Sequence, residues 1–349
     1  MVRRGAIALL CALTLLAPAP VGASPQAARV RPAVEAHGFA DPSVVRYDGG
    51  YLAVMTGAYV PRAVASTPTG PWTRVDAALP ELPTWARSAE VWASDLVQAD
   101  GQWVLYFSAT VRGMGPRGRC IGVATSTDPL DTFVPRARPL VCPHQADTPR
   151  PDDLAGSKAR QRGLPRLGVI DPSAFTDRGT RYLLYKTQGT PSSIRLLPLT
   201  PDGTRKRSGS KSRELLRAPG IVENPLLMRH RDDLVLLTSE GYYGGCGYRT
   251  TWRRSPGLTH WRPTAPRVLV DHRRSRICGP GGADAVEDAA GRRTVFLHGW
   301  TCWSDRTACP AHRDLERSPG LDPRRSLFAA RLEWREGRPR LRFLSPAIS

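Results

Sequence analysis

The sequence predicts an all-β protein, a five-bladed β-propeller, and three observations lead to that class. Five blocks share one plan, in which a polar or acidic cluster precedes a strand, a turn and a second strand: residues 40–57, 92–109, 170–187, 222–239 and 282–299. The segments between them repeat a turn followed by an aromatic residue, as in STPTGPW, STDPLDTF and RSPGLTHW. Residues 326–344 alternate like a hairpin that completes the last unit. A degenerate unit that recurs every roughly 50 to 80 residues, with room for four strands, is typical of propeller blades.

The N-terminus is predicted to be a secretory signal peptide covering residues 1–23. Arg3 and Arg4 precede an apolar stretch from Ala6 to about Ala17, and Val-Gly-Ala leads to Ser24. This stretch is too short for a membrane span; a buried N-terminal helix is the alternative. No other segment is apolar for long enough to cross a bilayer. We therefore expect a secreted, extracellular protein without membrane insertion, whose residues 24–349 form a single catalytic domain.

The cysteines that follow the signal peptide agree with export. There are six of them, an even number, and an oxidising compartment favours three disulfides. Pairing between sequence neighbours is the simplest connectivity: Cys120–Cys142, Cys246–Cys278 and Cys302–Cys309. A zinc site is the alternative, but the spacing contains no paired C-x-x-C motif.

The chain is strongly basic, with a formal net charge of +19. Such a charge suggests a nucleic acid or another polyanion as partner. However, the arginines are scattered apart from residues 204–213, and no nucleic-acid-binding motif accompanies them. We interpret the charge as a solvated surface and expect no nucleic-acid partner.

Three of the five blocks begin with a carboxylate in similar context: Asp41 in ADPS, Asp171 in IDPS and Glu223 in VENP. The first strand of each blade lines the central channel, so these residues are expected to converge. Hydrolysis of a glycosidic bond needs one carboxylic acid to protonate the leaving oxygen and one carboxylate to serve the anomeric carbon. The alternative is that these residues are turn formers that cap neighbouring backbone amides. Three together in aligned blocks favour a hydrolytic site.

The same blocks resemble glycoside hydrolase family 43, five-bladed propeller enzymes that act on arabinose- and xylose-containing polysaccharides. ADPSVVRYDGGYLAV, WASDLVQADGQWVLYFS, IDPSAFTDRGTRYLLYK and VENPLLMRHRDDLVLLTSEGYY are similar, in order, to motifs of its first four blades. The chain departs from the pattern at Ser94, where proline is usual, and at RHRDDLVLL, which lacks an aromatic pair. These departures affect the expected choice of substrate more than catalysis.

The resemblance implies a role for each carboxylate. Asp41 matches the general base, Glu223 the general acid, and Asp171 the residue that holds and tunes the acid. Like-charge repulsion from Asp171 is expected to keep Glu223 protonated near neutral pH. Asp95, in the second block, is expected to anchor its blade rather than react.

Residues beside the block starts are weaker candidates. Phe39, Trp92 and Tyr242 are predicted to bind substrate by stacking on a sugar ring, as are Trp85 and Tyr243, with core packing as the alternative for each. His298, in VFLHGW, matches a family position that faces a central calcium ion or water cluster; a structural histidine is the alternative. No cofactor is expected to be required, and a structural calcium ion in the channel, held by His298, is a further expectation.

Together these features predict a secreted, inverting glycoside hydrolase that acts on plant polysaccharides or oligosaccharides as a monomer. An arabinofuranosidase or arabinanase is favoured, and a β-xylosidase is next. A non-catalytic, carbohydrate-binding propeller is the main alternative, although it has no need of an acid and its tuning partner. A retaining, fructan-hydrolase-like propeller is disfavoured because Ala40 and Ser43 stand where that motif carries asparagines.

Overall fold

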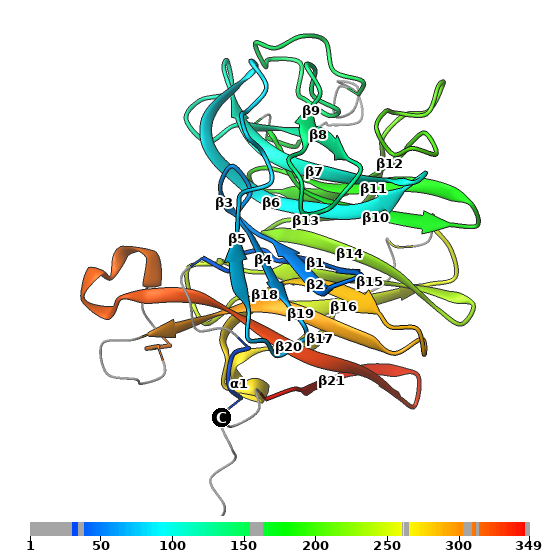
Figure 1. The fold of residues 1–349 in the computed structure, drawn as a ribbon. Helices are drawn as coiled ribbons and strands as arrows, with labels where there is room; N and C mark the ends of the chain where they lie inside the picture. The colour runs from blue at the N-terminus through cyan, green and yellow to red at the C-terminus, as the bar shows by residue number, and fades with distance from the viewer. Residues whose placement is uncertain are drawn as a thin grey trace, which may run out of the picture.

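Five antiparallel sheets around one axis make up the fold, which confirms the predicted five-bladed β-propeller (Figure 1). The computed structural model describes residues 30–33, 38–153, 163–165, 167–259, 261, 265–302, 309–311 and 314–345. The predicted signal peptide lies outside the described residues. No helix among the described residues is long and apolar enough to span a membrane.

Each blade begins at its innermost strand and proceeds outward. Blade 1 contains β1 (Ser43–Tyr47), β2 (Gly50–Val54), β4 (Arg62–Ala65) and β5 (Thr73–Val75). Blade 2 contains β3 (Gly57–Ala58), β6 (Ala86–Ala99), β7 (Gln102–Val111), β8 (Arg119–Ser126) and β9 (Val134–Pro135). In this blade β3 pairs with β6 at the inner edge.

The remaining blades follow the same scheme. Blade 3 contains β10 (Val169–Asp177), β11 (Thr180–Thr187), β12 (Ser192–Pro198) and β13 (Arg213–Ala218). Blade 4 contains β14 (Val222–His230), β15 (Asp233–Glu240), β16 (Arg249–Ser255) and β17 (Arg267–Val270). Blade 5 contains β18 (Cys278–Glu287), β19 (Arg293–Cys302), β20 (Pro323–Arg335) and β21 (Arg338–Phe343). The helices are short: α1 (His272–Ser275), η1 (Leu315–Arg317) and η2 (Pro319–Leu321).

Turn chemistry explains several of the hairpins. In the β6–β7, β10–β11 and β20–β21 turns, a residue of positive φ precedes a glycine of positive φ: Asp100-Gly101, Arg178-Gly179 and Glu336-Gly337. Two-residue turns with positive φ at both positions match the right-handed twist of the flanking strands. These dipeptides therefore fix the register of the hairpins that carry the site.

The core lies between the blades rather than at the axis. Alternate residues of a strand face opposite neighbours: Phe107 of β7 packs toward blade 1, and Tyr106 packs toward blade 3. Similar clusters join blades 3 and 4 and blades 4 and 5. A fifth cluster joins Ala53 of blade 1 to Phe296 of blade 5 and closes the ring. Burial of apolar surface at each contact thus fixes every blade between two others.

Backbone hydrogen bonds and disulfides add to the packing between blades. The backbone amides of Ala33 and Phe39 donate to the carbonyls of Leu327 and Arg325 in β20. The three predicted disulfides are present: Cys120–Cys142, Cys246–Cys278 and Cys302–Cys309. Cys246–Cys278 joins the loop after β15 to the start of β18. This loop borders the channel mouth.

Candidate active site

At the channel mouth the same backbone conformation recurs in every blade, within or just before its first long strand. A residue with φ between 41° and 59° stands there in every blade: Asp41, Ala93, Asp171, Asn224 and Gly282. In blades 2 to 5 the pairing register shifts around this residue, as in a β-bulge. Such backbone conformations are costly for residues other than glycine and cluster at functional sites. The five residues line one small cavity.

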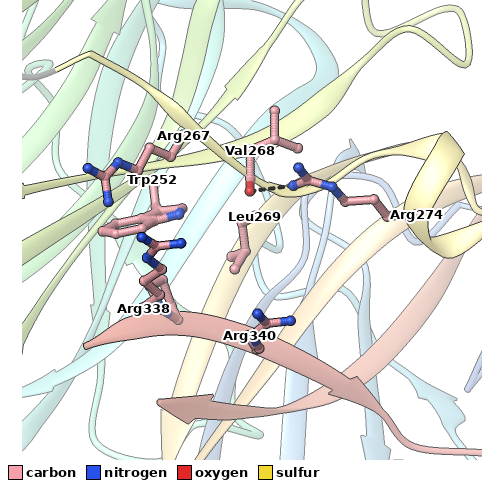
Figure 2. A pocket seen from close by; sticks show the side chains of 8 residues that line it. Trp252, Arg267, Val268, Leu269, Arg274, Arg338 and Arg340 are labelled. Atoms are coloured by element: carbon pink, nitrogen blue, oxygen red, sulfur yellow. Dashed lines mark hydrogen bonds between the residues drawn. The ribbon is translucent and has the colours of Figure 1, made fainter. Parts of the chain in front are cut away.

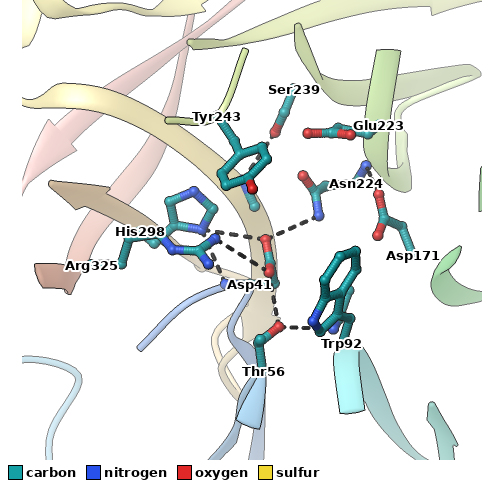
Figure 3. A network of polar contacts seen from close by, with 12 residues as sticks. Asp41, Thr56, Trp92, Asp171, Glu223, Asn224, Ser239, Tyr243, His298 and Arg325 are labelled. Atoms are coloured by element: carbon teal, nitrogen blue, oxygen red, sulfur yellow. Dashed lines mark hydrogen bonds and ion pairs between the residues drawn. The ribbon is translucent and has the colours of Figure 1, made fainter. Parts of the chain in front are cut away.

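This alignment corrects the equivalence expected from the sequence. Asn224, and not Glu223, occupies the place in blade 4 that Asp41 and Asp171 occupy in theirs. Glu223 lies one residue earlier, at the position of Trp92 in blade 2. The side chains of Glu223 and Asn224 nevertheless border the same site (Figure 3).

In blade 5, two glycines at the channel mouth leave room for neighbouring rings. Gly282 has a φ of 59°, and a Cβ there would lie 2.6 Å from His298 Nδ1. A Cβ on Gly281 would lie 2.1 Å from a ring carbon of Tyr248. The two glycines therefore make room for these two rings to approach the carboxylates.

Asp41 is held as a carboxylate by four neighbours. Its Oδ2 accepts a hydrogen bond of 2.9 Å from Thr56 Oγ1, and its Oδ1 accepts one of 3.3 Å from Asn224 Nδ2. Arg325 Nη1 lies 3.6 Å from Oδ2. Burial raises the pKa of Asp41, but Arg325, His298 and the two hydrogen bonds outweigh it, so the pKa lies below its ordinary value. Asp41 is thus ionised near neutral pH, as a general base requires.

Arg325 is itself positioned by aromatic rings. Its guanidinium carbon lies 5.5 Å from the centroid of Tyr243 and 5.4 Å from that of Trp300. The indole of Trp300 donates to the carbonyl of Tyr243, and the Tyr243 hydroxyl donates to Glu316. These contacts direct a cation toward Asp41 from blade 5 (Figure 3).

Glu223 is buried and contacts a different pair of groups. Its Oε2 accepts a hydrogen bond of 2.7 Å from Lys186 Nζ, and its Oε1 lies 2.7 Å from Tyr248 Oη. The same Tyr248 oxygen lies 2.7 Å from Asn224 Oδ1. A hydrogen-bonded chain therefore runs from Glu223 through Tyr248 and Asn224 to Asp41.

The protons of this chain can be counted. The hydroxyl of Tyr248 has one proton, yet it faces two oxygens that are acceptors unless Glu223 is protonated. The Asn224 amide nitrogen is already directed at Asp41. The Tyr248 hydroxyl can therefore donate to only one of these two oxygens at a time, Glu223 Oε1 or Asn224 Oδ1. In either case it joins Glu223 to the side chain that contacts Asp41.

Asp171 lies beside Glu223. Its Oδ2 accepts a 3.0 Å hydrogen bond from the backbone amide of Asn224. Burial, followed by repulsion from Glu223, raises the pKa of Asp171 to about 7, although Lys186 opposes the shift. Asp171 and Glu223 are coupled through space, so a proton taken up near neutral pH belongs to the pair.

The calcium role expected for His298 stays a prediction, and the structure defines the contacts of its ring. The ring is fully buried, and burial lowers its pKa to about 4, so it is neutral. Its Nδ1 accepts the Asp41 backbone amide at 3.0 Å, which leaves the proton on Nε2. That Nε2 is a buried donor without a partner in the structure, and calcium prefers oxygen ligands. In the described part of the chain, no group of three or more His, Cys, Asp or Glu side chains is placed to hold a metal ion.

Asp95 lies deeper in the channel and ties blades together. It accepts hydrogen bonds from Ser43 Oγ of blade 1, at 3.2 Å, and from the Ala174 amide of blade 3, at 2.7 Å. Burial and repulsion from Asp284 raise the pKa of Asp95 to about 7. These contacts agree with the expected anchoring role.

The predicted stacking residues separate into two groups. Phe39 is only 1% exposed and packs against Trp72 in the core between blades 1 and 5, so its ring is not available to substrate. Trp85 is likewise buried, stacked on Phe107. These two expectations were wrong because the residues flank the site in sequence while their side chains face the core.

Trp92 and Tyr242 remain accessible. Trp92 is partly buried beside the carboxylates, with the Arg119 guanidinium carbon 3.2 Å from its ring centroid and its indole nitrogen donating to Glu90. Tyr242 is 44% exposed on the loop after β15, and its hydroxyl donates to Asp314. Tyr243, on the same loop, reaches the polar network (Figure 3).

A second cavity, of about 550 Å³, lies at the outer edge of blades 4 and 5 (Figure 2). It is lined by four arginines, by Trp252 and by three aliphatic residues. Among the described residues no carboxylate lines this cavity, so they supply none of the acidic groups that general acid–base hydrolysis of a glycoside uses.

Several residues of the site were not identified from the sequence: Thr56, Lys186, Asn224, Tyr248 and Arg325. Two of them are of residue types that are rare in this chain, a feature that could have marked them. Asn224 is the only asparagine of the chain, and Lys186, one of only four lysines, ends an apolar strand. Tyr248 and Arg325 lie in unremarkable segments and reach the site only through the packing of blades 4 and 5.

Comparisons with known proteins agree with this fold and site. Residues 32–339 match the model of glycosyl hydrolases family 43, and the chain belongs to that family, whose members hydrolyse O-glycosyl bonds. The chain is 32% identical over 287 residues to the probable arabinan endo-1,5-α-L-arabinosidase A of Aspergillus niger, covering 74% of this chain and 81% of that protein.

Two further similarities are more limited. The probable arabinan endo-1,5-α-L-arabinosidase C of Aspergillus niger is 40% identical over 91 residues, which are 25% of this chain and 28% of that protein. The structure of Cellvibrio cellulosa α-L-arabinanase complexed with arabinohexaose superposes with a TM-score of 0.64 at 19% identity, covering 87% and 95% of the two chains. The structural likeness supports the fold alone.

Proposed function

We propose that this protein is a secreted, inverting hydrolase of arabinan, in which Asp41 is the general base and Glu223 the general acid. The observation that carries the proposal is the placement of Asp41, which its neighbours hold as a carboxylate, and of Glu223 at one channel mouth, linked through Asn224 and Tyr248. Two carboxyl groups in opposite protonation states are what glycoside hydrolysis needs.

In the proposed reaction, Glu223 gives its proton to the glycosidic oxygen as the bond to the anomeric carbon breaks. Asp41 accepts a proton from a water molecule that attacks the opposite face of the sugar. Asp171 holds the backbone amide of Asn224 and, by its proximity, favours the protonated form of Glu223. The product then has the anomeric configuration opposite to that of the substrate.

Arabinan is the favoured substrate because the relatives that align over most of their length carry that activity in their names. Partly exposed Trp92 and the Tyr242 loop offer aromatic surface for a sugar ring beside the carboxylates. Aromatic faces bind the apolar faces of sugars while polar groups orient the hydroxyls. Export is supported by the N-terminal sequence and the three disulfides.

The test is hydrolysis of linear arabinan, xylan and the corresponding aryl glycosides by the purified protein. We expect release of arabinose or arabino-oligosaccharides, with at least tenfold lower kcat/KM on xylosides. Preference for xylosides would show that the substrate is a xyloside and not arabinan. Binding of arabinan without turnover of any glycoside would instead support the non-catalytic propeller.

A further inference from the structure

Lys186 is a buried cation in direct contact with the acid. It lies near the end of β11 and is 5% exposed, and its Nζ donates to Glu223 Oε2 at 2.7 Å. Burial of an ammonium group costs several kcal/mol unless a paired charge compensates it. Because arginine outnumbers lysine in this chain 46 to 4, a lysine here is not explained by composition.

The charges around Lys186 can be summed over the whole site. Three carboxyl groups face it, Glu223 from β14, Asp171 from β10 and Asp41 from the start of blade 1. Burial lowers the pKa of Lys186, but these carboxylates outweigh burial and raise it above the ordinary value, so it is charged. Two further cations act on the site: Arg325 beside Asp41, and Arg119, which interacts electrostatically with Asp171. His298 is neutral. Of the three cations, Lys186 is the one that donates to Glu223.

We propose that Lys186 is a positioning residue that favours the ionised form of Glu223 and stabilises the Glu223 carboxylate after proton donation. The inference rests on the proposed role of Glu223 as general acid. In that step the Glu223 O–H bond breaks and the proton binds the glycosidic oxygen. That oxygen keeps the electron pair of the cleaved carbon–oxygen bond, and the water proton goes to Asp41. Glu223 is left as a carboxylate whose Oε2 already contacts the ammonium group.

Removing this positive charge has two consequences. The pair binds its protons more tightly, so the basic limb of the pH profile moves to higher pH. Glu223 also becomes a weaker acid, which slows substrates whose leaving group needs a proton and spares those with an activated leaving group. A lysine that served packing alone would lower activity without moving the limb.

The experiment compares the wild-type protein with Lys186→Met, which keeps the chain length without charge, and Lys186→Arg, which restores the charge. Lys206→Met, in the turn after β12, is the matched control. We expect the basic limb of the kcat/KM profile to move to higher pH by at least one unit in Lys186→Met. In Lys186→Arg the limb should return toward its wild-type position. The kcat on arabinan should fall at least tenfold more than the kcat on a dinitrophenyl arabinofuranoside. An unmoved basic limb in a folded Lys186→Met variant would overturn the inference.

A second readout separates this inference from the proposed function. Carboxyl carbon NMR of the labelled protein follows the titration of Asp171 and Glu223 without any substrate. Lys186→Gln replaces Lys186→Met if the latter does not fold by circular dichroism. We expect the titration of the pair to move to higher pH when the charge is removed, even if the substrate differs from arabinan. Identical titration curves in wild type and variant would refute the role of Lys186 while leaving the hydrolase proposal intact.

Discussion

Substitution of the two proposed catalytic carboxyl groups should give different patterns on different leaving groups. Glu223→Gln keeps the size of the side chain and an oxygen that accepts from Lys186, but it has no proton to donate. General acid catalysis contributes about 10²- to 10⁴-fold, which corresponds to about 3 to 5 kcal/mol of transition-state stabilisation. We therefore expect that loss in kcat/KM on arabinan, where a sugar alcohol must leave. On a dinitrophenyl arabinofuranoside, which leaves without a proton, the loss should be less than about tenfold.

Asp41→Asn should behave differently because water must be activated for every substrate. Asparagine still accepts from Thr56 but cannot take up a proton, so both substrates should lose about a hundredfold or more. Asp48→Asn and Glu81→Gln, at exposed positions, are the controls and should leave kcat/KM unchanged. The assay is steady-state kinetics on both substrates at the pH optimum, with circular dichroism to confirm folding. Equal losses for Glu223→Gln and Asp41→Asn on both substrates would refute the assignment of acid and base.

Three further outcomes are expected. Asp171→Asn keeps the acceptor for the Asn224 amide but removes the charge that repels Glu223, so the basic limb of kcat/KM should move to lower pH; an upward or absent shift in the pH profile would contradict this role. Asp95 and Asp171 have pKa values of about 7, above those of the unfolded chain, so the folded state binds more protons. The contribution of these groups to the free energy of unfolding should therefore fall as pH rises from about 4 to about 7, and level off above that range. Urea titrations should show this slope reduced in Asp95→Asn, and an unchanged slope would show that Asp95 does not contribute. Non-reducing peptide mapping should recover Cys302 linked to Cys309, and free thiols at both positions would be incompatible with the structure.

The fold could be predicted from the sequence because its repeat is local. Each hairpin carries its own turn dipeptide, such as Asp100-Gly101 or Arg178-Gly179, and each strand alternates between two apolar faces. The disulfides were predictable for a similar reason, since each bond joins two cysteines that follow one another along the sequence.

The site was predictable only in part. Asp41, Asp171 and Glu223 were found because they begin repeated blocks, and the structure brings them to one channel mouth. The one-residue offset at Asn224 was hidden because the positive φ that defines the equivalent position leaves no mark in a non-glycine residue. Contacts between distant segments, such as Tyr248 with Glu223, depend on how blades pack and have no sequence pattern.

The aromatic candidates show a related limit. Phe39 and Trp92 were both predicted to bind substrate because each lies close in sequence to the start of a block. In the structure the Phe39 ring is buried against Trp72, whereas the Trp92 ring borders the carboxylates. The two residues differ in their offset from the residue of positive φ: Trp92 lies one residue before Ala93, whereas Phe39 lies two residues before Asp41. Successive side chains of an extended chain point to opposite faces, so this offset decides which ring faces the site.

The configuration of the first product tests the central claim most directly. If Asp41 activates water on the face opposite the leaving group, a single displacement inverts the anomeric carbon. Proton NMR of an arabinofuranoside digest, recorded before mutarotation, should then show the β-anomer appearing first from an α-linked substrate. Initial appearance of the α-anomer would mean a covalent intermediate and would contradict the assignment of Asp41 as a base.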